Sequence, residues 1–204
     1  MLIKLRDYDR IHRIIRTVVM NEGADPSASC LYFGVIGSLI LSKHFGIHAS
    51  PRCGVAAFRF DPEKMGLLYG RERKGEIISA RDGFHCWIEA EDWIIDFSIP
   101  SLSYADLRGT KFPPKMFQVK LDQMANCISE VQGSTGFFLE CCPRITSDLV
   151  DDWFESALNL ELARVCLTWY KKVPSKIPDS VFIYSASGCG NVARLSGPTV
   201  KSKW

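Results

Sequence analysis

The clearest feature in the pattern of hydrophobic positions is an uncharged run from Leu31 to Leu41. Asp25 precedes this run and can cap a helix, Pro26 suits the first helical turn, and Gly46 favours the end of the helix. A helix that is apolar on every side belongs in the interior of a protein. The pattern therefore predicts a buried helix over residues 25–46.

Apolar residues also recur at helical spacing from Leu5 to Val19, with arginines on the opposite side. This spacing predicts an amphipathic helix that begins near Asp7 and ends before Gly23. His12 lies within this segment. We expect it on the exposed surface of the helix, without a part in catalysis.

Two runs typical of β-strands, 84–90 and 93–98, are separated by Glu91 and Asp92, which favour a turn. With these two residues as the loop, Ala90 lies opposite Trp93. Because side chains alternate along a strand, one face of this hairpin is entirely apolar. That face carries Phe84, Cys86, Ile88, Ala90, Trp93, Ile95 and Phe97. The other face carries His85, Trp87, Glu89, Ile94, Asp96 and Ser98.

In this register His85 and Asp96 are diagonal neighbours on adjacent strands, about 7–8 Å apart at the backbone, and their side chains can form a hydrogen bond. A slip of one residue would place them on opposite faces of the hairpin. Two interpretations stay open at this point. The histidine is either oriented by the carboxylate for chemistry, or the two residues form an ordinary pair on a solvated sheet face.

Cys30 lies near the first turn of the predicted buried helix. The free N–H groups and the dipole at a helix N-terminus stabilise an anion, and this favours the thiolate form of a cysteine there. The alternative is a structural cysteine, because cysteine is among the residues most often buried in protein interiors.

The remainder of the chain predicts further strands and helices around the hairpin. Strands are expected over 53–60, 136–142 and 181–184, and helices over 121–131 and 146–172, the last of them interrupted near Asn159. We expect the tail, 196–204, to be loose. This pattern predicts an α+β fold in one domain, 1–204, with the candidate site in residues 1–100 and residues 101–204 completing the fold.

The composition is that of an ordinary globular protein, with 204 residues, 47% of them hydrophobic and 24% charged. The net charge is +2 and there is no long basic run, which argues against nucleic acid as a partner. The N-terminus lacks the apolar core and cleavage site of a signal peptide, so we expect a cytoplasmic protein without a membrane partner, its eight cysteines reduced. No C-x-x-C pair occurs, and we predict neither a metal site nor a cofactor.

The hairpin motif resembles that of a known superfamily. His85-Cys86-Trp87-Ile88-Glu89, followed by Trp93 and Asp96, is similar to the His-x-Trp-x-Glu, Trp, Asp pattern of the transglutaminase-like branch of papain-like cysteine proteinases, in which a cysteine opens the central helix. The resemblance covers roughly the first half of the chain and suggests an uncharacterised bacterial family within that superfamily. Two departures stand out: Phe97 follows Asp96 where that branch commonly has proline, and no glutamine precedes Cys30.

The resemblance implies a papain-like fold, in which a buried helix carrying Cys30 packs on an antiparallel sheet carrying His85 and Asp96. Cys30 would be the nucleophile, His85 its proton partner, and Asp96 the residue that orients His85. The Cys30 backbone and the Asn21 side chain are the predicted oxyanion hole, and Trp87 is the predicted substrate contact. The predicted reaction is acyl transfer from a small-molecule, peptide or protein substrate to water or to an amine. A binding or structural protein that retains the fold without catalysis is the alternative.

Overall fold

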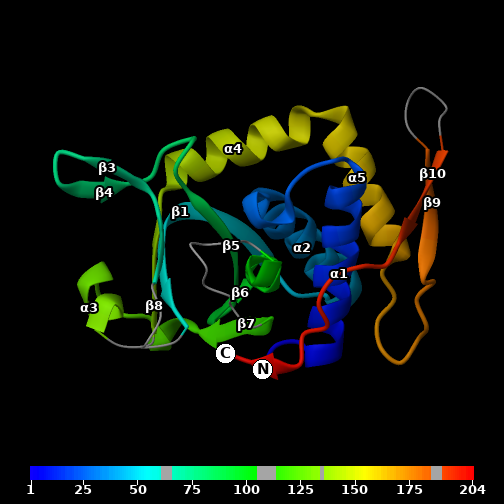
Figure 1. The fold of residues 1–204 in the computed structure, drawn as a ribbon, viewed down its shortest axis with the longest axis horizontal. Helices are drawn as coiled ribbons and strands as arrows, with labels where there is room; N and C mark the ends of the chain where they lie inside the picture. The colour runs from blue at the N-terminus through cyan, green and yellow to red at the C-terminus, as the bar shows by residue number, and fades with distance from the viewer. Residues whose placement is uncertain (61–65, 105–113, 134–135, 185–189) are drawn as a thin grey trace.

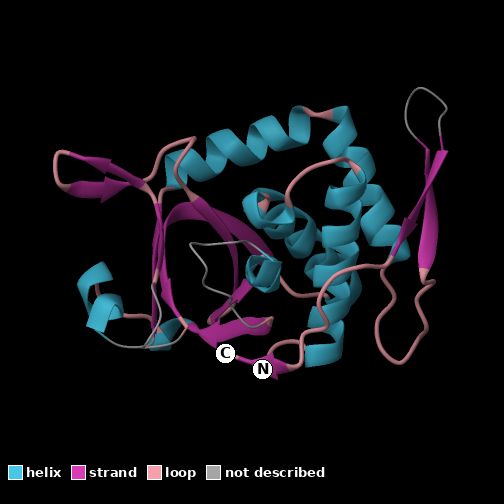
Figure 2. Ribbon diagram, in the orientation of Figure 1, coloured by secondary structure: helices cyan, strands magenta, loops and turns pink. Residues whose placement is uncertain are grey.

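The structure is a computed structural model that describes residues 1–60, 66–104, 114–133, 136–184 and 190–204. It is an α+β fold in which helices pack on a mostly antiparallel sheet (Figures 1 and 2). In chain order the elements are α1 (Leu5–Asn21), η1 (Pro26–Ala28), α2 (Cys30–Phe45), β1 (Ala49–Arg59), β2 (Leu67–Tyr69), β3 (Arg71–Arg73), β4 (Glu76–Ile78), β5 (His85–Ala90), β6 (Trp93–Asp96), η2 (Ile99–Tyr104), β7 (Lys115–Lys120), η3 (Leu121–Gln123), α3 (Ile128–Gly133), β8 (Gly136–Cys141), α4 (Pro143–Glu155), α5 (Ala157–Trp169), β9 (Ser180–Tyr184), β10 (Gly190–Arg194) and β11 (Ser202–Lys203).

The main sheet has seven strands in the order β11-β7-β6-β5-β1-β2, and β8 also pairs with β1. Strand β1 is long enough to pair with β5 along its first half and with β2 and β8 along its second half. Gly54 lies where these pairings meet. A Cβ atom at this position would lie 1.9 Å from the Glu140 carbonyl oxygen, so the close approach of β1 and β8 requires a glycine.

The largest hydrophobic cluster lies between the sheet and the helices α1, α2 and α5, which Figure 1 shows gathered on one side of it. Helix α2 approaches the β5–β6 hairpin closely because it carries glycine where the two meet. A Cβ atom on Gly37 would lie 2.6 Å from Phe97 and 2.8 Å from Ile88. The predicted burial of the uncharged run is confirmed, since the central residues of α2 are buried.

The opposite face of the hairpin is also buried, which the sequence pattern did not show. Trp87 and Ile94 belong to a second hydrophobic cluster with Phe58, Phe117 and residues of β8. Figure 2 shows that the sheet itself is strongly curved. The interpretation of a pair on a solvated sheet face is therefore wrong for His85 and Asp96, whose residues are each 1% exposed.

The C-terminal tail is part of the fold, contrary to the prediction of a loose segment. Strand β11 pairs in parallel with β7, and the Trp204 amide donates to the Met116 carbonyl at 3.0 Å. The Trp204 ring stacks on Phe117 with the ring centroids 4.7 Å apart. A stacked aromatic residue at the end of the chain thus covers the second cluster.

The predicted helix over 121–131 is instead a 3-10 turn, η3, followed after a loop by the short helix α3. The other predicted strands are present as β1, β8 and β9. The long C-terminal helix is two helices, α4 and α5, which meet at Ser156 rather than at Asn159. Strands β9 and β10 form a separate hairpin beside α5 (Figure 1). In the part of the chain that the structure describes, no helix combines the length and hydrophobicity needed to cross a bilayer.

Candidate functional site

The β5–β6 hairpin has the register that the sequence pattern predicts, with Ala90 opposite Trp93 and Ile88 opposite Ile95. This register places His85 and Asp96 on the same face. Nε2 of His85 and Oδ2 of Asp96 are 2.6 Å apart, a short hydrogen bond between two buried side chains. The backbone at the turn accommodates this register because Glu91 adopts a left-handed conformation with φ of 56°.

Ser98 fixes the other oxygen of the Asp96 carboxylate. The Ser98 amide and hydroxyl donate to Oδ1 of Asp96 at 2.8 and 2.6 Å. With Oδ1 held by two donors, Oδ2 is directed at His85. A carboxylate held by three hydrogen bonds has a fixed orientation and is well placed to orient an imidazole.

Cys30 is the first residue of α2, immediately after a short 3-10 turn. Asp25 stabilises that turn by accepting from the Ser27 amide at 2.8 Å, and the Ser29 hydroxyl donates to the Asp25 carbonyl at 2.6 Å. Asp25 therefore caps the 3-10 turn and not the main helix. This arrangement leaves Cys30 half-buried at the positive end of the α2 dipole.

Cys30 and Asp96 lie on two sides of the His85 imidazole. Burial alone lowers the pKa of His85, but the charge of Asp96, its hydrogen bond and the neighbouring Cys30 thiol together raise the pKa to about 10. Nδ1 of His85 is buried and makes no regular hydrogen bond with any residue that the structure describes. The Cys30 thiol is nevertheless near enough to affect the ring, since it contributes to the raised pKa of His85.

Aromatic side chains enclose the imidazole on its remaining sides. The Tyr69 ring lies over it with centroids 4.5 Å apart and is tilted by 30°, and the Phe58 ring meets it edge-on at 5.4 Å. An aromatic face close to a protonated imidazole gives an attractive cation–π interaction. Tyr69 was not among the candidates from the sequence. Strand β2 is only three residues long, so the alternation of apolar and polar residues does not reveal its pairing with β1.

A surface pocket of about 330 Å³ opens beside Cys30. It is lined by Cys30, Tyr69, Phe84 and the loop 81–83. Two exposed ion pairs stand at its rim, where Arg81 pairs with Asp152 and Asp82 with Arg71. The half-buried thiol is thus accessible to a substrate from this pocket.

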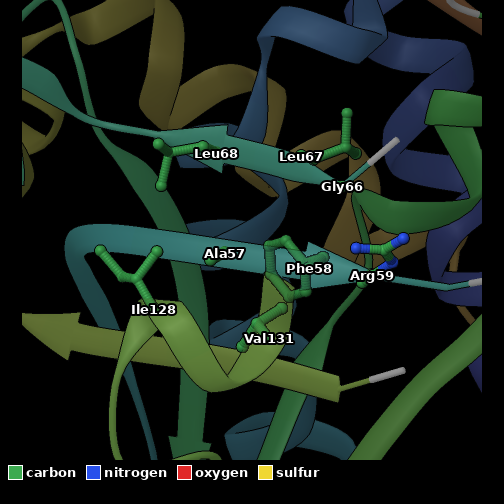
Figure 3. Close-up of a pocket in the computed structure, with 8 residues that line it drawn as sticks. All are labelled: Ala57, Phe58, Arg59, Gly66, Leu67, Leu68, Ile128 and Val131. Atoms are coloured by element: carbon green, nitrogen blue, oxygen red, sulfur yellow. The ribbon is translucent and has the colours of Figure 1, made fainter. Parts of the chain in front are cut away.

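A second, smaller pocket of about 160 Å³ lies between β1, β2 and α3 (Figure 3). Its lining includes Ala57, Phe58, Arg59, Leu67, Leu68 and Val131. None of its described lining residues is a cysteine, histidine or carboxylate. It offers apolar contacts but no nucleophile, whereas the lining of the first pocket includes Cys30.

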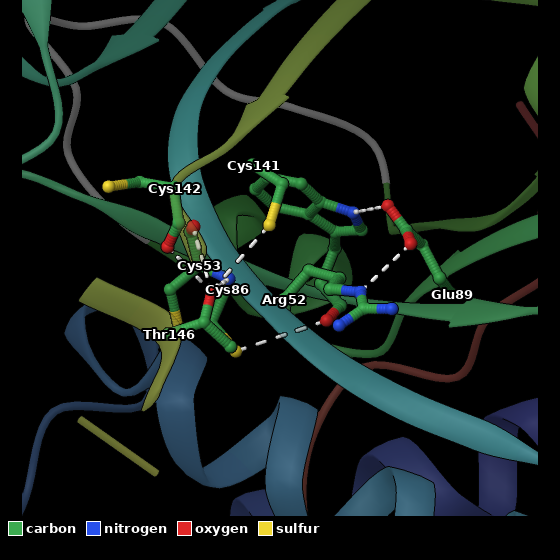
Figure 4. Close-up of polar contacts among 8 residues, drawn as sticks. Arg52, Cys53, Cys86, Glu89, Cys141, Cys142 and Thr146 are labelled. Carbon is green, nitrogen blue, oxygen red and sulfur yellow. Dashed lines mark hydrogen bonds and ion pairs between the residues drawn. The ribbon is translucent and has the colours of Figure 1, made fainter. Parts of the chain in front are cut away.

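Trp87 and Asn21, two of the predicted site residues, are engaged elsewhere. Trp87 is 1% exposed, and its indole N–H donates to Glu89, which also pairs with Arg52 at 2.9 Å (Figure 4). The ring is therefore part of the second cluster and presents no surface for a substrate contact. The Asn21 amide donates to Glu22 at 3.2 Å at the end of α1, and no hydrogen bond among the described residues connects it to Cys30.

The other cysteines near the site have structural environments. Cys53 and Cys86 are opposite each other on β1 and β5, and the hydrogen bond that the Cys86 thiol donates to Cys53, together with burial, holds the pKa of Cys86 well above its usual range. The Thr146 hydroxyl accepts from the Cys53 amide at 2.9 Å and ties α4 to β1, beside Cys141 and Cys142 (Figure 4). All these thiols are free, and Cys30 is the one that opens a long helix.

His12 is buried, contrary to the expectation of a surface position. It is 0% exposed, and its Nδ1 lies 2.8 Å from the Phe97 carbonyl oxygen, next to Asp96. The spacing could have indicated this, because Tyr8, His12, Ile15 and Val19 share one face of α1. A polar residue within an apolar stripe is easily assigned to the wrong side of a helix.

Comparisons with known proteins give a family and a fold. A crystal structure described as that of genomics APC5867 is 33% identical to this chain, with a TM-score of 0.89, and the match covers 100% of this chain and 98% of that one. No match was found among curated proteins. A family model described as "Protein of unknown function (DUF2026)" matches residues 4–204. Because this match spans nearly all of the sequence, the chain belongs to the DUF2026 family.

Proposed function

We propose that the protein is a cysteine-dependent acyl-transfer enzyme of the papain-like, transglutaminase-like type. The observation that carries the proposal is the buried His85–Asp96 hydrogen bond, which leaves Nδ1 of His85 free, with the Cys30 thiol close enough to raise the pKa of the ring. In this proposal Cys30 is the nucleophile, His85 the base and Asp96 the orienting acid, a combination that activates a thiol for attack on a carbonyl carbon.

In the first step the Cys30 thiolate attacks the carbonyl carbon of an amide, peptide or thioester. A carbon–sulfur bond forms, and the carbonyl electron pair moves to oxygen to give a tetrahedral oxyanion. His85, protonated at neutral pH because its pKa is raised, gives its Nδ1 proton to the leaving amine or thiol as the carbon–nitrogen or carbon–sulfur bond of the substrate breaks. The product of this step is a thioester on Cys30.

In the second step neutral His85 removes a proton from water or from an acceptor amine, which attacks the thioester. The bond to the Cys30 sulfur breaks, the acid or the new amide leaves, and the thiolate–imidazolium pair returns. Asp96 keeps Nε2 of His85 protonated throughout, so that Nδ1 is the nitrogen that exchanges the proton.

The start of α2 supplies the stabilisation of the oxyanion. The first N–H groups of a helix have no intrahelical acceptor, and that of Cys30 lies next to the sulfur. One well-placed donor typically contributes about 3–4 kcal/mol to transition-state stabilisation. Asn21 is not proposed as a second donor because its amide is directed to Glu22.

The test is the rate of alkylation of Cys30 by iodoacetamide from about pH 5 to about pH 10, with peptide mapping to separate the thiols. Cys127 is a stringent internal reference, because it is exposed and the Ser129 hydroxyl lowers its pKa. We expect Cys30 to react faster than Cys127 at about pH 6, and His85→Ala to abolish the difference. Equal rates at Cys30 and Cys127 in the wild type would contradict the proposal and favour a non-catalytic protein.

A further inference from the structure

Two side chains of α1, one helical turn apart, contact the backbone at the end of β6. The Tyr8 hydroxyl donates to the carbonyl oxygen of Asp96, and Nδ1 of His12 lies 2.8 Å from the carbonyl oxygen of Phe97. Both residues are 0% exposed. Asp96 is thereby held through its own main chain as well as through its carboxylate.

Both side chains are donors over a wide range of pH. A carbonyl oxygen only accepts, so Nδ1 of His12 carries the proton. Burial lowers the pKa of His12 to about 4, which keeps the ring neutral, with Arg13 and Arg16 adding to the effect and the Phe97 carbonyl and Asp96 opposing it. Burial, and then the charge of Asp96, raises the pKa of Tyr8 well above its usual value, so its hydroxyl keeps its proton.

Tyr8 also connects β6 to β7. Its hydroxyl accepts from the Phe117 amide at 3.2 Å, and Phe117 is the cross-strand partner of Asp96. The hydroxyl therefore bridges the two strands at the position of Asp96. The Tyr8 ring packs on Phe97 with centroids 4.8 Å apart, which leaves little freedom for the hydroxyl to move.

His12 connects the same strand end to the helix of the nucleophile. Its ring stacks on Phe33 with centroids 5.7 Å apart and an interplanar angle of 14°. Phe33 lies in the first turn of α2, three residues after Cys30. One imidazole thus contacts the element that carries Cys30 and the backbone next to Asp96.

These contacts require two polar side chains to be buried in the core, which has a desolvation cost. Phenylalanine and leucine would fill the same space without that cost. Nε2 of His12 is buried with no hydrogen-bond partner among the described residues. A group retained with half of its hydrogen-bonding capacity unused needs a reason beyond packing. The carbonyls that it and Tyr8 hold belong to Asp96 and to the residue after it.

We infer that Tyr8 and His12 are positioning residues, which fix the backbone of Asp96 so that its carboxylate keeps the geometry of the hydrogen bond to His85. The inference rests on the proposed function of the site and adds α1 to its machinery. Without either donor the end of β6 gains freedom and Oδ2 of Asp96 departs from the plane of the imidazole. Neither residue touches the substrate in this assignment.

The experiment compares Tyr8→Phe, His12→Leu and His12→Asn with the wild type. Asparagine keeps a donor near the position of Nδ1, so His12→Asn is the conservative variant of His12→Leu. Tyr170→Phe is the matched control, because Tyr170 is also a fully buried tyrosine whose hydroxyl donates to a carboxylate, Asp7, away from β6. Three quantities are measured: the titration of the His85 ring by NMR with labelled histidine, the alkylation rate of Cys30 against pH, and the melting temperature.

We expect the midpoint of the His85 titration to fall by about one pH unit or more in Tyr8→Phe and His12→Leu, since a less well aligned carboxylate stabilises the imidazolium less. Alkylation of Cys30 at about pH 6 should slow about tenfold or more, because small displacements in a catalytic arrangement have large effects on rate. In His12→Asn the His85 midpoint and the alkylation rate of Cys30 should both be close to the wild-type values. Tyr170→Phe should lower the melting temperature and leave both unchanged.

An unchanged His85 midpoint in a folded Tyr8→Phe protein would overturn the inference, and so would equal changes in Tyr170→Phe. If His12→Leu fails to fold, the comparison of Tyr8→Phe with Tyr170→Phe still tests the inference, because each of these substitutions removes a single oxygen atom. The two proposals fail separately. A wild-type Cys30 without enhanced alkylation contradicts the proposed enzyme, whereas the titration of His85 tests the positioning of the pair whether or not the thiol reacts.

Discussion

Nε2 of His85 and Oδ2 of Asp96 are 2.6 Å apart, with side chains 2% and 1% exposed. The two residues lie eleven positions apart on adjacent strands, and both are buried. A buried imidazolium–carboxylate pair gains stability only where the geometry is good and the remaining polar atoms are satisfied. Ser98 satisfies the second oxygen of the carboxylate, and the Cys30 thiol lies close enough to the ring to raise the pKa of His85.

Asp96→Asn should separate the role of the charge from that of the hydrogen bond. The amide can still contact His85 but carries no charge, so we expect the pKa of His85 to fall well below about 10 and the ring to become neutral near pH 7. Alkylation of Cys30 should slow, because the amide can hold the ring in the wrong tautomer. NMR titration of His85 and mapped alkylation measure the two effects. A His85 midpoint equal to that of the wild type would show that Asp96 does not set this pKa.

The stability of the protein should decline from pH 6.5 to about pH 10. The pKa of His85 is raised from 6.5 in the unfolded chain to about 10 in the folded protein, so in this window the folded state binds the proton more strongly. The contribution of the His85–Asp96 pair to the free energy of unfolding is fully present below pH 6.5 and is lost as the pH rises through about 10. Urea unfolding at several pH values measures this slope, and His85→Gln, which has no titrating group here, should make it shallower. The same slope in both proteins would contradict the raised pKa.

Substitutions in the apolar core and at Cys30 should separate structure from chemistry. Ile88→Ala or Ile95→Ala removes a fully buried side chain and should cost about 2–5 kcal/mol through the cavity left behind. Cys30→Ala should cost about 1 kcal/mol, as for a typical substitution. Mapped alkylation should survive in the folded fraction of the isoleucine variants. A loss of stability on Cys30→Ala as large as that of Ile88→Ala would favour a structural role for Cys30.

Gly54→Ala should be strongly destabilising, because the new Cβ atom would meet the main chain of β8 at 1.9 Å. Overpacking against a flexible side chain costs about 1–3 kcal/mol, and here the backbone itself must move. Gly136→Ala is the matched control, since its Cβ atom would meet nothing within 4 Å. Urea unfolding of both variants gives the difference. Equal stability would mean that β1 and β8 can separate without cost.

The sequence alone determined the local part of the site. The alternation of side chains along 84–98 and the Glu91–Asp92 turn predicted the register of β5 and β6. This register places His85 and Asp96 on the same face of the hairpin. The uncharged run and its flanking residues likewise predicted a buried helix that starts near Cys30. These inferences succeed because period and turn chemistry act over a few neighbouring residues.

Tertiary structure decided which polar residues enter the interior. The spacing of α1 places His12 on the apolar face, but its hydrogen-bond partner in the interior, the Phe97 carbonyl, lies 85 positions away and could not be predicted from the sequence. Tyr69 over the imidazole and Trp204 on Phe117 are likewise contacts between segments distant in the sequence. A period shows which face of an element is apolar, but not whether a second layer covers the other face. At this hairpin the curvature of the sheet brings that second layer over His85 and Asp96, and the pair lies out of water for that reason.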